Sequence, residues 1–168
     1  SENEFFIYDK VVLASHADES LKILSDPTEQ EKEILSNFKY RKNIAVIHSD
    51  ENSMPKNKKA WCSWNSLLDP ENKKNSSVTY WLNQLQNLKI NKNIFLTINP
   101  FFKIDSNKIY NEIDFTHTYY DDNALKNQSK LNSSQNVNNT LFAGSYFGYG
   151  FHEDGIKSSI EMLKTLND

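Results

Sequence analysis

The chain has 168 residues, of which 38% are hydrophobic, and it carries a formal net charge of -3 at pH 7. This length supports one hydrophobic core and pieces of a second. Because its lysines are dispersed among a similar number of acidic residues, the charge gives no general electrostatic drive towards nucleic acid or an anionic membrane. A lone cysteine, Cys62, cannot form an internal disulfide, and no apolar run approaches the roughly 20 residues that span a bilayer. We expect a cytoplasmic protein with no nucleic-acid partner.

The beginning of the sequence indicates a fragment. Ser1 to Phe6 contains neither an initiator methionine nor the basic and then apolar pattern of a signal peptide, and a strand follows almost at once. We therefore interpret the chain as part of a longer protein.

The first elements have a parallel-sheet character. Residues Lys10–Ala14, KVVLA, are apolar without alternation, which predicts a strand buried on both faces. A short helix with Ser15 or Asp18 as its cap is expected next. Asp26 and Pro27 then predict the N-cap and first position of a longer helix. Its apolar face comprises Ile34, Leu35 and Phe38.

From Asn43 the period changes to that of strands. Five segments are rich in β-branched and aromatic residues and are separated by loops of Asn, Lys, Ser and Asp. They are KNIAVIHSD (42–50), AWCSWNSL (60–67), SSVTYWLNQL (76–85), NIFLTINP (93–100) and KIYNEIDFTH (108–117). The third is expected to turn into a short helix near residues 83–88.

The second of these strands has aromatic side chains on both faces. Alternation places Trp61 and Asn65 on one face and Cys62 and Trp64 on the other. Trp61, Trp64 and the nearby Tyr80 are candidates to line an apolar substrate pocket, although the core of the sheet is the favoured place for such residues. We expect Cys62 itself to be a buried small hydrophobe.

The last part of the chain predicts helix, strand and helix. The first helix is expected over about 122–131, followed by a polar loop over 132–139 and a short strand over 140–144. The last helix should begin at Glu153 or Asp154 and end near Leu166. Its buried face is expected to comprise Ile156, Ile160, Leu163 and Leu166.

All four glycines of the chain, Gly144, Gly148, Gly150 and Gly155, lie between this strand and this helix. Such a turn points backbone N–H groups at a helix N-terminus, which suits a phosphate or an electron-rich carbonyl. A plain turn capped by Asp154 explains the glycines equally well. The segment is neither a Walker motif nor GxGxxG.

The four histidines predict no metal site. His16, His48, His117 and His152 are not spaced as metal ligands. His16 and His152 are nearest to the glycine segment, and a structural hydrogen-bonding role is expected for them rather than catalysis.

Several motifs together resemble the flavin-containing amine oxidase family. Phe142-Ala143-Gly144 and Asp154-Gly155-Ile156 match its closing strand–loop–helix motif, and DKVVLASHAD is similar to the strand before its substrate domain. AWCSWNS, SVTYWLNQLQNL, FLTINP and GYGFHEDGIKS, in this order, resemble a bacterial branch of predicted NAD/FAD-binding oxidoreductases. The resemblance covers nearly the whole chain.

The resemblance implies an α+β fold in which a mixed or antiparallel sheet interrupts a Rossmann-like domain. Residues 1–38 would belong to the FAD-binding domain, 39–120 would form the substrate domain, and 121–168 would supply a helix and the terminal FAD-binding strand and helix. Strands at 10–14 and 141–143 would then be adjacent and parallel. GxGxxG, which receives the pyrophosphate in this family, is absent.

Individual residues acquire roles from the same resemblance. Gly144, Ser145, Gly155 and Ile156 would bind FAD, the last two beneath the pyrimidine end of the flavin. The family often has an acidic residue where this chain has Ser145. Aromatic residues in the glycine segment would flank the flavin or pack under the loop; they are Tyr146, Tyr149 and Phe151.

The implied function is that of the C-terminal fragment of an FAD-dependent oxidoreductase. Hydride would pass from a small amine or an apolar, lipid-like substrate to the flavin, and the sequence identifies no catalytic residue. The fragment alone is expected to be inactive, to retain little FAD and to expose strand edges that favour a homodimer. The alternative is a non-catalytic ligand-binding module with an aromatic-faced β-sheet.

Overall fold

A computed structural model describes residues 5–166. They form a mixed α and β protein with a parallel pair of strands, an antiparallel sheet and five α-helices within this range. The chain divides into two compact units, one made of the residues up to Arg41 and from Thr118 on, the other of Lys42–His117. Two long strands, β2 and β6, cross the division.

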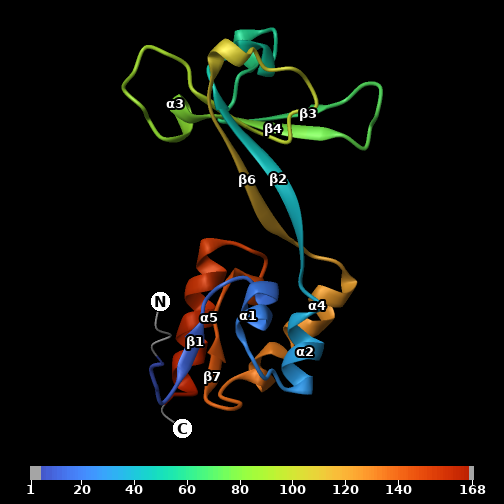
Figure 1. Ribbon diagram of the computed structural model, residues 1–168. Coiled ribbons are helices and arrows are strands. Elements are labelled where there is room, and N and C mark those ends of the chain that lie inside the picture. Colours follow the sequence, from blue (N-terminus) through green and yellow to red (C-terminus); the bar gives the residue numbers. More distant parts are fainter. Residues whose placement is uncertain (1–4, 167–168) are drawn as a thin grey trace. The chain divides into compact units, whose positions relative to one another are not determined.

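Within the described residues the first unit contains two short strands and four α-helices, which are labelled in Figure 1. In chain order they are β1 (Val11–Leu13), α1 (Ala17–Ile23), α2 (Glu29–Leu35), α4 (Asp122–Gln128), β7 (Thr140–Phe142) and α5 (His152–Lys164). Two short 3-10 turns, Leu131–Ser134 and Ser145–Phe147, flank β7.

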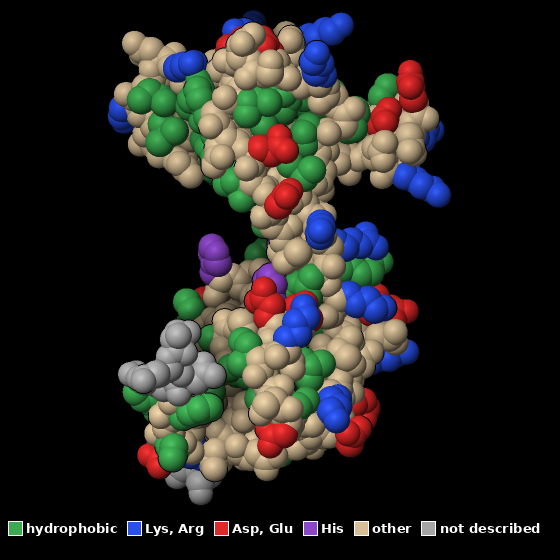
Figure 2. All heavy atoms as spheres, viewed as in Figure 1, with side chains coloured by type: hydrophobic (Ala, Val, Ile, Leu, Met, Phe, Trp, Pro, Cys, Tyr) green, Lys and Arg blue, Asp and Glu red, His purple; other side chains and the backbone are tan. Residues whose placement is uncertain are grey.

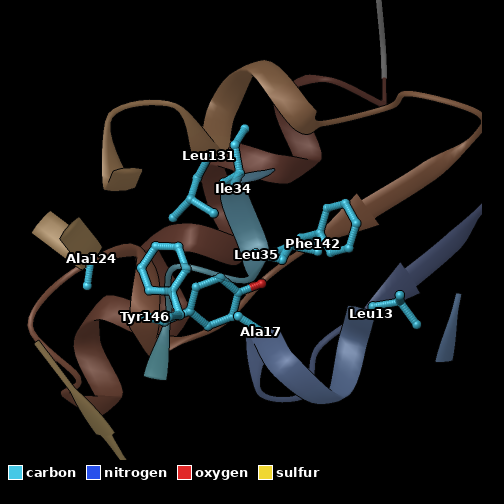
Figure 3. Packing of buried hydrophobic residues seen from close by; sticks show 9 residues of the cluster. Leu13, Ala17, Ile34, Leu35, Ala124, Leu131, Phe142 and Tyr146 are labelled. Carbon is cyan, nitrogen blue, oxygen red and sulfur yellow. The ribbon is translucent and has the colours of Figure 1, made fainter. Parts of the chain in front are cut away.

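The expected pairing of the first and last strands is confirmed. β1 and β7 are parallel neighbours, with Val11 opposite Thr140 and Leu13 opposite Phe142. Leu13, Phe142 and Tyr146 enter one core with helices α1, α2 and α4 (Figure 3). Leu141 and Ala143 point to the other side of the pair, where they pack with Met162 of α5. Helices therefore cover both sides of the parallel pair, which is the usual setting of such strands.

Helix α5 does not bury the face that its periodicity predicts. Ile156, Ile160 and Leu163 are each more than half exposed, whereas Ser158 and Met162 are buried and Leu166 is partly buried. Of the described strands, only β7 makes extensive contact with α5. Two strands are too narrow to cover the whole apolar stripe, so much of it faces solvent.

The first two helices begin at other residues than the sequence suggests. His16, rather than Ser15 or Asp18, precedes the first turn of α1. α2 begins after Thr28, not at Pro27, because Thr28 and Glu31 satisfy each other's backbone N–H groups: the Thr28 Oγ1 accepts from Glu31 N at 3.2 Å, and Glu31 Oε2 accepts from Thr28 N at 2.7 Å. This reciprocal pair outcompetes the Asp-Pro start.

The second unit is built on a five-stranded sheet of order β3-β4-β5-β2-β6. The strands are β2 (Lys39–His48), β3 (Trp64–Leu68), β4 (Ser76–Trp81), β5 (Phe95–Ile98) and β6 (Ile109–Tyr119), with the short helix α3 (Leu82–Leu85) after β4. The pairs β3–β4, β4–β5 and β5–β2 are antiparallel. Three 3-10 turns complete this unit: Glu51–Ser53, Lys58–Ala60 and Ser106–Lys108.

Asparagines at positive φ make several of the turns. Asn138 and Asn139, with φ of 48° and 58°, form a two-residue turn between Val137 and Thr140, which pair as an isolated antiparallel bridge. Asparagine tolerates this left-handed region better than other non-glycine residues. The abundance of asparagine thus has a structural use in a chain with four glycines.

Figure 2 shows lysine and acidic side chains interspersed on each unit of the face in view. Among residues 5–166 no helix combines the length and the apolar composition that crossing a bilayer demands.

Candidate functional site

The glycine segment connects β7 to α5 through a tightly held turn. Gly144 donates its N–H to Ser158 Oγ at 2.9 Å, and Ser158 in turn donates to the Gly155 carbonyl at 2.7 Å. The carbonyl of Ser145 accepts from the N–H groups of Gly148 and Gly150, each at 3.1 Å. The end of the strand is thereby fixed against the first turns of the helix.

Three of the four glycines are required by the fold itself. A Cβ on Gly144 would lie 2.5 Å from the Tyr146 ring, and a Cβ on Gly148 would collide with the Asp154 carboxylate. Gly150 has φ of +91°, a conformation that L side chains rarely adopt. The space beside Gly144, where the resemblance implies a cofactor, is therefore occupied by Tyr146.

Gly155 is the exception. It is the fourth residue of α5, its φ is not in the left-handed region, and a Cβ there would meet nothing closer than the Ser145 N atom at 3.8 Å. Glycine inside a helix lowers stability by about 0.5–1 kcal/mol relative to alanine. The fold therefore does not require a glycine at this position, and an open backbone surface results.

Asp154 sets the electrostatics of the helix end. Its Oδ2 accepts from the N–H groups of Tyr149 and Phe151, each at 3.0 Å. With Glu153 beside it, the first turn of α5 carries two carboxylates. These partly neutralise the positive end of the helix dipole, so the site disfavours a phosphate and tolerates a neutral acceptor such as a ring carbonyl.

The open donors are not those that the resemblance implies. Gly155 N–H bonds to the Phe151 carbonyl at 3.3 Å, because the helix begins at His152, earlier than expected. Within residues 5–166 the backbone N–H groups of Ser145, His152 and Glu153 make no hydrogen bond. These three are the groups that a ligand could use.

The aromatic residues of the segment separate into two kinds. Tyr146 is 2% exposed and packs in the core, where burial raises the pKa of its phenol. Tyr149 and Phe151 are 74% and 69% exposed, so they do not pack under the loop. Ile156 is also exposed, at 57%. These three side chains therefore lie on the surface.

The turn after β1 lies at the same end of the parallel pair as Gly144, because both strands run in one direction and both segments follow a strand's carboxyl end. His16 in this turn stacks on Tyr40 with ring centroids 4.2 Å apart. The Tyr40 hydroxyl accepts from Ala17 N at 2.8 Å, and burial raises the pKa of Tyr40 to about 12. The stacking gives His16 a structural role. Ligands of open parallel sheets bind at the carboxyl ends of the strands, which is where this turn lies.

The aromatic candidates of the second unit form two separate groups. Trp61 lies before β3 and packs edge-on against Trp81 and Phe95, with its Nε1 donating to the Pro55 carbonyl at 2.8 Å. Trp64, which is 65% exposed, packs against Tyr80, its cross-strand neighbour. The strand predicted over 60–67 thus begins only at Trp64. Cys62 is exposed, so its expected burial is wrong.

Sequence reasoning missed a buried polar network in the second unit. His48 is fully buried; its Nε2 lies 2.8 Å from Thr97 Oγ1, and that oxygen lies 2.8 Å from Thr79 Oγ1. The Nδ1 accepts from Asp50 N at 3.1 Å, so the proton resides on Nε2. Burial lowers the pKa of His48, against a smaller opposing influence of Asp50. His48 alternates with Val46, and this period of two is the signal that could have placed it on the buried face.

Asp50 anchors the end of this network. It is 2% exposed and accepts from Lys108 Nζ at 3.1 Å, Asp105 N at 3.0 Å and Asn52 N at 3.3 Å. Burial alone would raise the pKa of Asp50, but these donors outweigh it and hold the pKa below its ordinary value. The network is fully bonded inside the protein and leaves no reactive group free.

No cluster suited to a metal occurs in the described part of the chain. Among residues 5–166 no three His, Cys, Asp or Glu side chains converge as a metal site would need.

Two hollows differ from the expected substrate pocket. A hollow of about 450 Å³ in the second unit is lined by polar residues: Ser49, Glu51, Asn91, Lys92, Asn93, Asn107 and Lys108. Beside the glycine segment a hollow of about 180 Å³ is smaller than the usual ~300 Å³ of a ligand pocket.

The lowered pKa of His48 predicts how the free energy of unfolding depends on pH. The unfolded chain protonates this imidazole near a pKa of about 6.5, whereas the folded chain protonates it only at lower pH. Between these values the unfolded state binds more protons, so the free energy of unfolding falls as pH falls, by up to about 1.4 kcal/mol per pH unit. Urea unfolding at several pH values between 7.5 and 5 measures this dependence of the free energy of unfolding on pH.

Two variants isolate the contribution of His48. His48→Gln should flatten the pH dependence, whereas His152→Gln, at an exposed position, should leave it unchanged. Equal slopes for the wild type and His48→Gln would contradict the assignment.

Comparison with known proteins identifies no relative. No protein-family model matches the chain, and a search of curated proteins returns no match.

Proposed function

We propose that this chain is the C-terminal part of an FAD-dependent oxidoreductase similar to the flavin-containing amine oxidases. The observation that carries the proposal is Gly155, a glycine inside a helix that the fold does not require. A bare backbone at this position suits close approach of a flat ligand. The residues fit the neutral ring of a flavin better than its pyrophosphate, because Glu153 and Asp154 supply negative charge at the same helix end.

The arrangement of the strands supports the same conclusion. β1 and β7 are parallel neighbours although the whole second unit separates them in sequence. The carboxyl ends of both strands lead into turns at the same end of the pair, and dinucleotide-binding sheets bind their ligands at the carboxyl ends of the strands. The antiparallel sheet between them corresponds to the substrate domain that the resemblance implies.

Within this proposal each residue has a limited task. Gly155 and Ile156 present the open surface of α5 to the flavin ring, while the N–H of Ser145 is available to a ring carbonyl. Gly144 contributes by admitting Tyr146, which fixes the turn. When bound, FAD supplies the capacity to accept a hydride from substrate. The chain's own residues orient the ring, and no side chain of the described residues is assigned as an acid or base.

The substrate is proposed to be a small amine or an apolar, lipid-like molecule. Each unit offers its own candidates to contact it: Trp61, Trp64 and Tyr80 in the second unit, or Tyr149 and Phe151 in the first. Exposed Trp64 against Tyr80 also favours the second candidate function, a non-catalytic module that binds a ligand on the sheet. In that case no cofactor would be involved.

Flavin content separates the two functions. The purified full-length gene product should be yellow and should release FAD on heating, because the cofactor is held without a covalent bond in this proposal. The 168-residue chain should retain little FAD, since it lacks the GxGxxG turn that holds the pyrophosphate. Absorbance spectra and fluorescence of the heat-released supernatant measure both.

Two outcomes would contradict this proposal. A folded, colourless full-length protein that releases no flavin would remove the oxidoreductase and leave the binding module. Stoichiometric FAD on the 168-residue chain would show that the site is complete without a further domain.

A further inference from the structure

The polar hollow of about 450 Å³ lies at one end of the sheet in the second unit. Its lining comes from three segments that meet there: 49–51 after β2, 91–93 before β5 and 107–108 before β6. The three strands are neighbours in the sheet, in the order β5-β2-β6. This volume falls within the range of about 300–1,000 Å³ that is usual for small-molecule sites, and the lining contains no apolar residue. A small hydrophilic ligand therefore fits, whereas an apolar one does not.

The uncharged polar groups of this lining are of two kinds. Asn93 is fixed at both ends of its amide, because its Nδ2 donates to Glu51 Oε1 at 2.8 Å and its Oδ1 accepts from Trp81 Nε1 at 3.1 Å. The side-chain amides of Asn91 and Asn107 make no hydrogen bond within residues 5–166. Each amide offers both donors and an acceptor, and so does a hydroxyl group. The lining thus combines a fixed wall with free groups that suit a polyhydroxylated ligand.

The charges of the lining leave one cation without a counter-charge. Glu51 Oε2 pairs with Lys58 Nζ at 2.8 Å, and Lys108 Nζ pairs with the buried Asp50 at 3.1 Å. Lys92, the third charged residue of the lining, forms no ion pair within residues 5–166. An anionic group on the ligand would supply the missing partner.

The position of the Lys92 ammonium is set by a neutral ring. Its Nζ lies 4.9 Å from the centroid of the Tyr110 ring, and hydrogen bonds from Lys92 and Ser49 lower the pKa of the Tyr110 phenol. A phenol below its pKa carries no charge, so the ammonium charge stays uncompensated. One free ammonium suits one negative charge. A doubly charged phosphate would be repelled by the carboxylates of Glu51 and Asp50, which lie in and beside the hollow.

We propose that this hollow binds a sugar acid, that is, a small polyhydroxylated carboxylate. The ligand carboxylate pairs with Lys92, and the ligand hydroxyls bond to the free amides of Asn91 and Asn107 and to the carboxylate of Glu51. The site lies wholly in the second unit, so it does not depend on the proposed flavin function. Its ligand differs in chemistry from the amine or apolar substrate proposed above.

Amide NMR spectra of the isotope-labelled 168-residue chain, titrated with sodium glucuronate at low salt, test this site. We expect saturable shifts in the backbone signals of residues 91–93 and in the indole N–H signal of Trp81, which donates to Asn93. The indole signal of Trp64 is an internal control, because this side chain does not line the hollow. It should stay in place.

Substitutions of Lys92 test the charge. Lys92→Gln should weaken glucuronate binding by at least about tenfold, because a charge-assisted hydrogen bond is lost. Lys92→Arg keeps the charge and should retain binding. Lys89→Gln is the matched control, since it removes the same charge from the same loop but outside the lining, and it should leave the affinity unchanged. All three side chains are exposed, so the circular dichroism of each variant should match the wild type.

Glucose and inorganic phosphate decide the class of ligand. Glucose that binds as tightly as glucuronate, or glucuronate binding that Lys92→Gln leaves intact, would overturn the recognition of a carboxylate. Inorganic phosphate that binds more tightly than glucuronate and shifts the same signals would make the hollow a phosphate site instead. The absence of any shift with glucuronate, galacturonate and gluconate at millimolar concentrations would show that the hollow binds no sugar acid.

Discussion

Replacing Asp50 by alanine is expected to lower the free energy of unfolding by about 3 kcal/mol. The buried carboxylate accepts from Lys108 Nζ and from the N–H groups of Asp105 and Asn52. Alanine leaves these three donors without their acceptor. Urea unfolding at neutral pH, followed by tryptophan fluorescence, measures the loss.

A matched aspartate distinguishes burial from hydrogen bonding alone. Asp69 also accepts from a backbone N–H two residues on, at 2.9 Å, and from a side-chain amide, but its loop is far more exposed. Asp69→Ala should therefore have a much smaller effect than Asp50→Ala, because water replaces the lost acceptor. Equal losses of unfolding free energy for the two variants would show that burial does not increase the stabilising effect of the Asp50 hydrogen bonds.

The same carboxylate adds a second window of pH dependence. Its folded pKa lies below the unfolded value of 3.8, so its contribution is present above about that pH and is lost as pH falls through the folded pKa. This window is separate from that of His48, which begins near pH 6.5.

The sheet pairing could be predicted from the sequence, and the burial of α5 could not. The uninterrupted apolar run at β1 and the resemblance of FAG at β7 suffice to pair strands that the second unit separates. The period of 3.6 in α5 identifies an apolar stripe correctly, but burial also requires something to pack on it. In the described part of the chain α5 packs on β7 and on the Ser145–Phe147 turn, which bury Ser158 and Met162 and leave the rest of the stripe exposed.

The candidate site shows the same limit. Sequence reasoning left the four glycines between a ligand-facing turn and a plain turn, whereas Gly144, Gly148 and Gly150 are required by Tyr146, Asp154 and a left-handed conformation. Which side chain a glycine admits depends on contacts that only the folded turn defines. The polar network of His48 escaped notice for a similar reason: its partners Thr79 and Thr97 come from other strands and meet only through the register.

Gly155→Ala separates a structural glycine from a functional one. In the 168-residue chain alanine should raise the free energy of unfolding by about 0.5–1 kcal/mol, because a Cβ there meets nothing closer than 3.8 Å and helix propensity improves. In the longer flavin-binding protein that we propose, the same methyl group should hold the flavin away from α5. We expect FAD affinity to fall about tenfold, which corresponds to about 1.4 kcal/mol. Denaturant unfolding and titration of the apoprotein with FAD provide the two measurements.

Lys157→Ala is the matched control, since it changes an exposed neighbour on the same helix without touching the open backbone surface. It should leave FAD affinity unchanged. If Gly155→Ala destabilises the chain, the glycine is needed for folding and no longer argues for a ligand. If it stabilises the chain while FAD binds to the full-length protein as before, the flavin does not approach α5 at this residue. Only a gain in stability together with a loss of flavin affinity supports the role proposed for the one glycine that the fold does not require.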